Sequence, residues 1–176
     1  MANQPSLIPG ETQRLNETLR LIHSHGSVRK YKPDPLELEM IQAIVAAGQR
    51  ASTSSNLQSF SVVAVTQAEK RARLAELCGN QAHVAEAQLF LVWCADLYRL
   101  DRACQLRGYT QVASFVENFL VAVIDASIAA QNAALAAESF GLGIWATSIV
   151  STYSPHWRGS RCASRSSATP SSSEAA

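Results

Sequence analysis

The stretch TQVASFVENFLVAVIDASIAAQNAALAAESFGLG, residues 110–143, decides the fold. It predicts one long helix at about 110–140, closed by a glycine at position 141 or 143. The segment is apolar over most of its surface and rich in alanine. We therefore expect a central helix that is buried on nearly all sides, or one that packs against a second subunit.

Helices are also predicted on the N-terminal side of this segment. Residues 11–23 carry Leu15, Leu19 and Ile22 at helical spacing. Residues 35–50 form a second candidate helix, with Asp34 as its N-cap and Pro35 in its first turn.

Two predicted strands and a short helix lie between these helices and the long one. The β-branched run at 59–66 and the apolar run at 88–96 predict strands, the second of them buried, and residues 67–78 predict the short helix. Because no glycine fingerprint of a βαβ unit accompanies this mixture, the sequence favours the α+β class.

Composition sets the broad class. The 176 residues carry a formal net charge of +1 and are 47% apolar, which suits a globular chain and gives no sign of nucleic-acid binding. We expect no apolar run of membrane-spanning length, and the polar N-terminus lacks the apolar core of a signal peptide. The four cysteines show no CxxC spacing, so we expect a reducing, cytoplasmic compartment without zinc.

The chain divides into two unequal parts. Residues 11–150 have the composition of a folded domain. Residues 151–176 hold nine serines and no Leu, Ile, Val, Phe or Met, so we expect a tail that is disordered or translated out of frame.

Several familiar catalytic and binding motifs are absent from the sequence. It contains no GxGxxG after a strand, no GxxxxGK[ST] and no GxSxG. His23 and His25 form an HxH pair without a third candidate ligand, so no metal site is predicted. Asp96 and Asp101 could form a catalytic pair, although a solvated strand end is the more common meaning of such a pattern.

Three segments carry groups suited to an anion. Ser27 and Arg29 offer a hydroxyl and a guanidinium, and residues 52–55 offer hydroxyls and loop amides. Residues 80–83, NQAH, follow Gly79 at a turn. Each segment taken alone is more often a solvated loop, a cap or a turn than an anion site.

The order of these segments resembles the nitroreductase family, and most of all its NADPH-preferring branch of nitroreductases and flavin reductases. The segments that carry the resemblance are HGSVRKY, RASTSSNLQSF, GNQAHVAEAQLFLVWCAD and AAQNAALAAESFGLGI. The resemblance covers roughly residues 15–146. It implies an α+β fold, a mixed sheet wrapped by helices, in an obligate homodimer with FMN at the interface.

The resemblance also implies the residues that contact the flavin. They are His25, Gly26, Ser27, Arg29, Thr53, Ser55 and Gln81. Gly26 departs from the family, which usually has arginine there, and Asn56 stands where an aromatic residue is common. The anion would then be the phosphate and ribityl region of FMN.

The implied activity is ping-pong electron transfer from NADPH through FMN to a nitroaromatic, a quinone or a free flavin. The cofactor supplies this chemistry, so no protein side chain is expected as a general acid or nucleophile. A catalytically inactive remnant, a dimerisation module and a different flavin reaction on the same fold remain open alternatives.

The C-terminal part departs from the family pattern. WATSIV stands where a YIGG-like turn is expected, and a later PLFG-type strand and basic pair are missing. Codons chosen for residues 163–168 can encode Val-Pro-Leu-Phe-Gly in a shifted frame, so we expect a fold that is incomplete at the C-terminus through truncation or a frameshift. The gene sequence tests this expectation.

Overall fold

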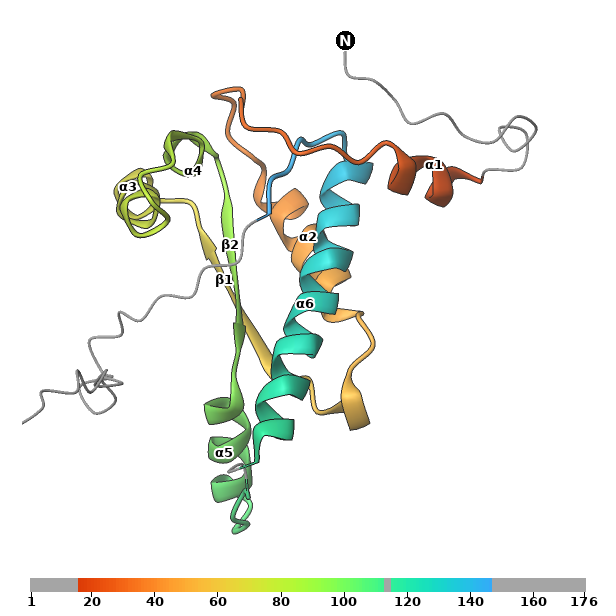
Figure 1. Ribbon diagram of the computed structural model, residues 1–176, viewed down its shortest axis with the longest axis vertical. Helices are drawn as coiled ribbons and strands as arrows, with labels where there is room; N and C mark the ends of the chain where they lie inside the picture. The colour runs from red at the N-terminus through yellow and green to blue at the C-terminus, as the bar shows by residue number, and fades with distance from the viewer. Residues whose placement is uncertain (1–15, 113–114, 147–176) are drawn as a thin grey trace, which may run out of the picture.

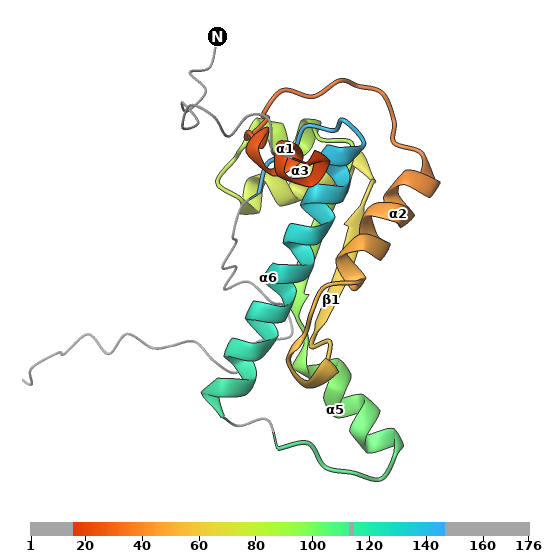
Figure 2. The same cartoon turned by 90° about the vertical axis from the view of Figure 1, so that its right-hand side faces the viewer.

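A long helix, α6 (Val116–Ser139), organises the molecule. The computed structural model describes residues 16–112 and 115–146. Helix α2 (Leu38–Gln49) and strand β2 (Phe90–Ala95) pack against α6, and β2 pairs antiparallel with β1 (Phe60–Val65) (Figure 1). The arrangement is two layers, with a helix pair on one face of a strand pair (Figure 2).

The shorter helices lie at the two ends of these layers. Helices α3 (Ala68–Leu77) and α4 (Ala82–Glu86) connect β1 to β2 in sequence and pack together at one end of the strand pair (Figure 1). Helix α5 (Leu97–Leu106) follows β2 at the other end. Helix α1 (Glu17–His23) lies near the C-terminal end of α6, and the short 3-10 helix η1 (Ser54–Asn56) precedes β1.

The core is built from the small side chains of α6. Its buried apolar positions are all alanine: Ala122, Ala126, Ala129, Ala133 and Ala137. Successive spacings of three and four residues place them on one helical face. Ile44 of α2 is 2% exposed and packs with Ala133 and Ala137. Trp93 of β2 packs against this group and also against a second one, in which Phe60 joins Ala126 and Ala129.

One glycine permits the close approach of these elements. A Cβ at Gly48 of α2 would overlap the indole of Trp93 and would lie 3.0 Å from the carbonyl oxygen of Ala129. No side chain fits there without displacement of the indole or of α6.

The predicted helices and strands occur in the expected order, but α4 and α5 were not predicted, and α6 begins at Val116 rather than near residue 110. The start of α2 was also placed too early. The chain stays extended as far as Glu37, with φ −66° and ψ 145°, and the helix begins at Leu38. Asp34 and Pro35 therefore precede α2 rather than cap it. Residues 11–15 of the first predicted helix and the tail at 151–176 lie outside the described residues.

The prediction of a buried strand at 88–96 was wrong for the single chain, and of the two alternatives for the long helix, burial on nearly all sides is not observed. Strand β2 is half-buried, because α6 covers one of its faces. Helix α6 is not buried on all sides, since its N-terminal half exposes large apolar side chains: Val116, Phe119, Leu120, Val123, Ile124 and Ile128.

The expectation about membrane-spanning length also needs correction. Helix α6 has 24 residues and contains an 18-residue window with a mean hydropathy of 1.6, so by length and composition alone it could cross a membrane. Its alanine face packs on α2 and β2, as the face of a core helix does.

Candidate functional site

The HGSVR segment, residues 25–29, is held against the chain that follows α6. Gly141 has φ +77°, a conformation that suits glycine and ends the helix, so the chain turns back. Ser27 then forms a parallel bridge with Ile144, and the amide of Val28 donates to the Ile144 carbonyl at 2.8 Å. Among the described residues, the sheet itself is the antiparallel pair β1 and β2, and this parallel bridge is isolated from it, so the expected mixed sheet is not seen there.

Gly143 makes this contact possible. A Cβ at this position would lie 2.7 Å from Cγ1 of Val28. The two glycines of GLG therefore have different roles, since Gly141 ends the helix and Gly143 admits the neighbouring segment.

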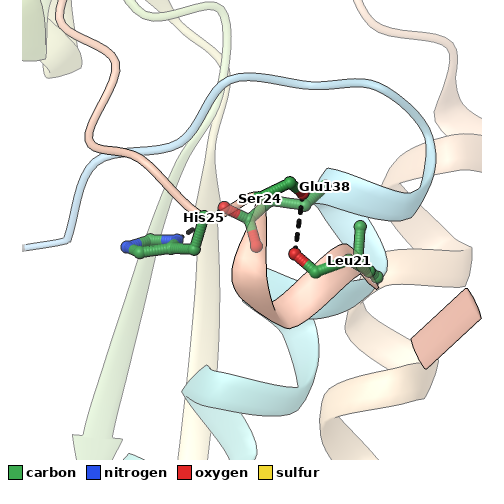
Figure 3. Close-up of polar contacts among 4 residues, drawn as sticks. All are labelled: Leu21, Ser24, His25 and Glu138. Atoms are coloured by element: carbon green, nitrogen blue, oxygen red, sulfur yellow. Dashed lines mark hydrogen bonds and ion pairs between the residues drawn. The ribbon is translucent and has the colours of Figure 1, made fainter. Parts of the chain in front are cut away.

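His25 is joined to the last turn of α6. Its Nδ1 lies 2.6 Å from Oε1 of Glu138 (Figure 3). The histidine side chain is 51% exposed, whereas that of Glu138 is 11% exposed. At the neighbouring Gly26, a Cβ would meet no described atom within 4 Å, so the space at that position is open.

Trp145 connects Arg29 with the start of α4. The guanidinium carbon of Arg29 lies 6.0 Å from the centroid of the indole, within the range of a cation–π contact. The ring of His83 meets the same indole edge-on, with centroids 4.2 Å apart. Nε2 of His83 is buried and has no hydrogen-bond partner in the described part of the chain.

Gln81 lies close to this group in sequence, as the N-cap residue of α4. Its side-chain amide donates to the Cys78 carbonyl at 2.7 Å. The amide group thus satisfies a carbonyl at the end of α3 and holds the side chain close to the turn between the two helices.

The serine-rich loop, residues 52–58, is anchored on a buried carboxylate of α6. Asp125 is 1% exposed and accepts from the amide of Ser54 at 3.0 Å and from that of Ser59 at 3.4 Å. Between these anchors Ser55, Asn56 and Gln58 have φ of 50°, 54° and 51°. Left-handed conformations cost free energy for residues other than glycine, so the anchored surroundings must hold the loop in shape.

A groove lies between this loop and the exposed apolar face of α6. Its volume is about 360 Å³. The lining residues are Ser52, Thr53, Ser54, Val121, Ile124, Asp125 and Ile128.

The predicted site residues therefore form two groups rather than one. His25, Gly26, Ser27 and Arg29 lie at the C-terminal end of α6, with the α4 region beside them through Trp145. Thr53 and Ser55 lie near Asp125, 13 residues earlier on the helix. At a rise of 1.5 Å per residue the groups are separated by about 20 Å along α6.

Three residues of these groups were missed from the sequence. Glu138, Asp125 and Trp145 contact segments that are distant along the chain. An acidic residue in a largely apolar segment was the available signal for both carboxylates, because such a group needs a hydrogen-bonding partner where the helix packs.

The aspartate pair at the end of β2 has a structural role in place of a catalytic one. Asp96 caps α5 by accepting from the Arg99 amide at 2.9 Å, and it also accepts from the Ser61 hydroxyl. The hydrogen bond from Ser61 is the main cause that lowers the pKa of Asp96. Asp101 instead accepts from Gln105 within α5.

The donor set fits a phosphorylated aromatic cofactor such as FMN. Arg29, the Ser27 hydroxyl and His25 are exposed cationic or hydrogen-bonding groups of one short segment that includes Gly26. Within residues 16–112 and 115–146, no cluster of three His, Cys, Asp or Glu side chains could hold a metal ion.

Two known proteins with similar sequences are named for the reduction of flavins. The chain is 45% identical over 129 residues to an NADPH-flavin oxidoreductase of Vibrio harveyi, covering 73% of this chain and 52% of that protein. It is 41% identical over 133 residues to an FMN reductase (NADPH) of Bacillus subtilis, covering 74% and 53%. The chain thus spans about half the length of these relatives.

Solved structures show the same fold. The structure of NfrA2 from B. megaterium has a TM-score of 0.71 at 38% identity, over 73% of this chain and 53% of that one. The NADPH:FMN oxidoreductase from Vibrio harveyi, solved with NAD+, has a TM-score of 0.67 at 45% identity, over 73% and 54%. The expected nitroreductase-like α+β fold is confirmed. The model of the nitroreductase family matches residues 22–158, and the chain therefore belongs to that family.

Proposed function

We propose that this chain binds FMN and acts as an NAD(P)H-dependent oxidoreductase on small electron acceptors. The observation that carries the proposal is the HGSVR segment, locked by Gly143 and Ile144 beside Trp145, in a member of the nitroreductase family. The relatives' names, FMN reductase and NADPH-flavin oxidoreductase, support FMN as cofactor and NADPH as donor.

The separation of the two groups of site residues supports a homodimer. Groups about 20 Å apart along α6 are too distant to enclose one flavin ring from within a single chain. The serine-rich loop borders the exposed apolar face of α6, so a second copy packed on that face would bring its own site residues to this loop. In the proposed assembly, FMN lies between the HGSVR segment of one subunit and the serine-rich loop of the other.

Each predicted residue has a role in this proposal. Arg29 holds the phosphate, because a guanidinium binds phosphate oxygens in a bidentate manner. Ser27 and His25 contact the ribityl chain or the ring. The remaining contacts come from Thr53 and Ser55 of the partner loop and from Gln81 near α4. Gly26 leaves out the arginine common in the family, and this reduces the expected affinity.

FMN, when bound, would supply the ping-pong hydride and electron transfer between the nicotinamide and a nitroaromatic, a quinone or free flavin. The chain's part is to orient the cofactor and to place positive charge where the reduced, anionic flavin needs it. The proposed flavin-binding unit spans residues 11–150, and the proposed location is the cytoplasm, with neither nucleic acid nor a membrane as a partner.

The test is flavin retention by purified chain 1–176. After incubation with FMN and gel filtration, the visible spectrum should show bound flavin. Arg29→Gln should weaken FMN affinity at least tenfold, since hydrogen bonds to charged groups are worth more than neutral ones. Arg107→Gln is the matched control, because Arg107 is exposed at the far end of α5. A folded but colourless protein would show that the family relationship does not extend to flavin binding in this chain.

A further inference from the structure

The serine-rich loop ends in a peptide group that is held from two sides. The carbonyl of Gln58 accepts from the guanidinium of Arg99 in α5. The amide of Ser59 donates to the buried carboxylate of Asp125 in α6 at 3.4 Å. This carbonyl and this amide belong to one peptide unit, so a cation from one helix and an anion from another fix its orientation.

The start of α5 makes further contacts with the same stretch of backbone. Arg99 donates a second hydrogen bond, to the carbonyl of Phe60 at 3.1 Å, and the backbone amide of Asp96 donates to the Ser59 carbonyl at 2.9 Å. Within residues 16–112 and 115–146, the side chain of Arg99 forms no ion pair. Its guanidinium is therefore directed at the backbone where the loop ends rather than at a carboxylate.

Stability of the fold alone does not account for this arginine. Gln58 and Arg99 are both exposed, so water can replace the guanidinium at the Gln58 carbonyl. Helix α5 contains no buried residue, so the core gains little from holding this helix against the loop.

The contribution of Arg99 is to the shape of the loop. Ser55, Asn56 and Gln58 have left-handed φ, which costs free energy for residues other than glycine and persists only where the surroundings hold it. Asp125 supplies that hold on the buried side. Arg99 supplies it on the exposed side, where the backbone would otherwise be free to relax.

We propose that Arg99 is a positioning residue for the serine-rich loop: it holds the peptide group between residues 58 and 59 against Asp125, and so keeps the loop in the shape that receives the ligand. This inference rests on the proposed function for the identity of the ligand, FMN, and for the contacts of Thr53 and Ser55 with it. Arg99 acts through the backbone of the loop and needs no contact with the ligand.

The first measurement needs no flavin. Amide hydrogen exchange in the ¹⁵N-labelled full chain, followed by NMR, reports how readily each amide is exposed by local opening. Arg99→Met keeps the apolar stem and removes the donors, so the Ser59 amide should exchange about tenfold faster, because a charged hydrogen bond that orients its peptide group is lost. The amides of Ala129 and Ala133, in the core of α6, should keep their exchange rates.

The second measurement is FMN affinity, by quenching of flavin fluorescence. Arg99→Met should weaken FMN binding by roughly tenfold, because the ligand must then order the loop as it binds. Arg99→Lys, whose ammonium can still donate to a carbonyl, should restore part of the Ser59 protection and part of the affinity.

Arg102→Met is the matched control. Arg102 is an exposed arginine of the same helix, and its guanidinium donates to the Gln105 side chain within α5. The variant removes the same charge from α5 without a change in the contacts of the loop. Exchange at Ser59 and affinity for FMN should both match those of the wild type.

Three results would overturn the inference. Unchanged exchange at Ser59 in Arg99→Met would mean that the guanidinium does not hold the peptide group. Equal acceleration at Ser59, Ala129 and Ala133 would mean a general loss of stability. Faster exchange at Ser59 with unchanged FMN affinity would mean that the ligand does not depend on the shape of the loop. If the wild type binds no FMN, the proposed function fails, and the exchange measurement still decides whether Arg99 positions the loop.

Discussion

The two faces of α6 differ in side-chain size more than in polarity. On the face that meets α2 and β2, the buried apolar positions are alanines, from Ala122 to Ala137. On the opposite face of the N-terminal half, Phe119, Leu120 and Ile124 are more than half exposed. A helix that packs at close range needs small side chains, and large apolar ones stabilise a structure only where another surface covers them.

The comparison teaches that the two faces serve different contacts. The alanine face is already satisfied within one chain, with Ala129 and Ala122 at 0% exposure. The open face borders the groove beside the serine-rich loop, so covering it would also enclose part of the proposed flavin site. Exposed apolar patches rimmed by polar groups are typical of interfaces.

Ala129→Leu should have the largest effect, because it breaks the alanine face. Ala129 contacts Phe60 and Trp93 and is fully buried, so a leucine must displace β2 or α2. Overpacking of this kind costs about 3 kcal/mol of unfolding free energy, at the upper end of the usual range. Urea denaturation followed by circular dichroism measures it.

The control is Gln131→Leu, which adds a leucine to the same helix at an exposed position. Its unfolding free energy should change by about 0.5 kcal/mol or less. Equal losses in both variants would mean that the two faces are not packed differently.

Asp125→Asn should have the next largest effect. Asp125 is the polar member of the buried face, and both of its oxygens accept from loop amides. Asparagine can accept from one amide but turns an NH₂ group toward the other, so one donor loses its partner. We expect a loss of about 2 kcal/mol in a urea titration, together with weaker FMN binding.

Asp101→Asn makes the same chemical change in α5, where the carboxylate accepts from the exposed Gln105 side chain. It should alter stability by a few tenths of a kcal/mol. If both variants behave alike, the buried anchoring of the serine-rich loop does not hold it in shape.

Sequence periodicity found α6, both strands and the glycine stop because these signals are local. The sequence left open whether Gly141 or Gly143 ends the helix, and the structure shows that one glycine meets a local requirement and the other a distant one. Gly141 has positive φ, which is a local requirement, whereas Gly143 is needed because Val28, more than 100 residues earlier, lies against it.

The parts of the site that were missed depend on such distant contacts. Glu138 pairs with a residue 113 positions away, and Asp125 holds amides 71 and 66 positions away. Neither partner is visible in a window of sequence. The open face of α6 was foreseen as one of two alternatives, since an apolar surface looks the same in sequence whether its own chain or a second copy covers it.

Leu120→Ser tests whether a second copy covers the open face of α6. It should weaken self-association and leave the folding stability of the monomer unchanged. The leucine is 53% exposed in the single chain, so its loss should leave monomer stability almost unchanged. If a second copy covers it, the variant should self-associate about tenfold more weakly, as expected for one lost interfacial leucine. Sedimentation equilibrium measures the dissociation constant.

Leu106→Ser is the matched control, because Leu106 is a leucine that is 79% exposed at the end of α5, outside the groove beside the serine-rich loop. Self-association should be unaffected by it. A wild-type chain that stays monomeric at every concentration would contradict the proposal that a second copy covers the open face of α6. The large apolar side chains there would then need another explanation.

The smallest expected effect is on the pH dependence of stability, and it arises at Asp96, outside both faces of α6. The hydrogen bond from Ser61 lowers the pKa of Asp96 in the folded chain, so the ionised aspartate stabilises the fold. That contribution is fully present above the ordinary aspartate pKa of about 3.9 and is lost as pH falls through the lower, folded value. Ser61→Ala should therefore be less stable than the wild type at pH 6, by on the order of 0.5 kcal/mol once solvent screening is allowed for.

The difference in unfolding free energy should shrink toward zero below pH 3 in urea titrations. The difference between Ala129→Leu and the wild type should persist, because overpacking does not depend on a titrating group. A gap for Ser61→Ala that is independent of pH would mean that its hydroxyl acts through packing instead of through Asp96.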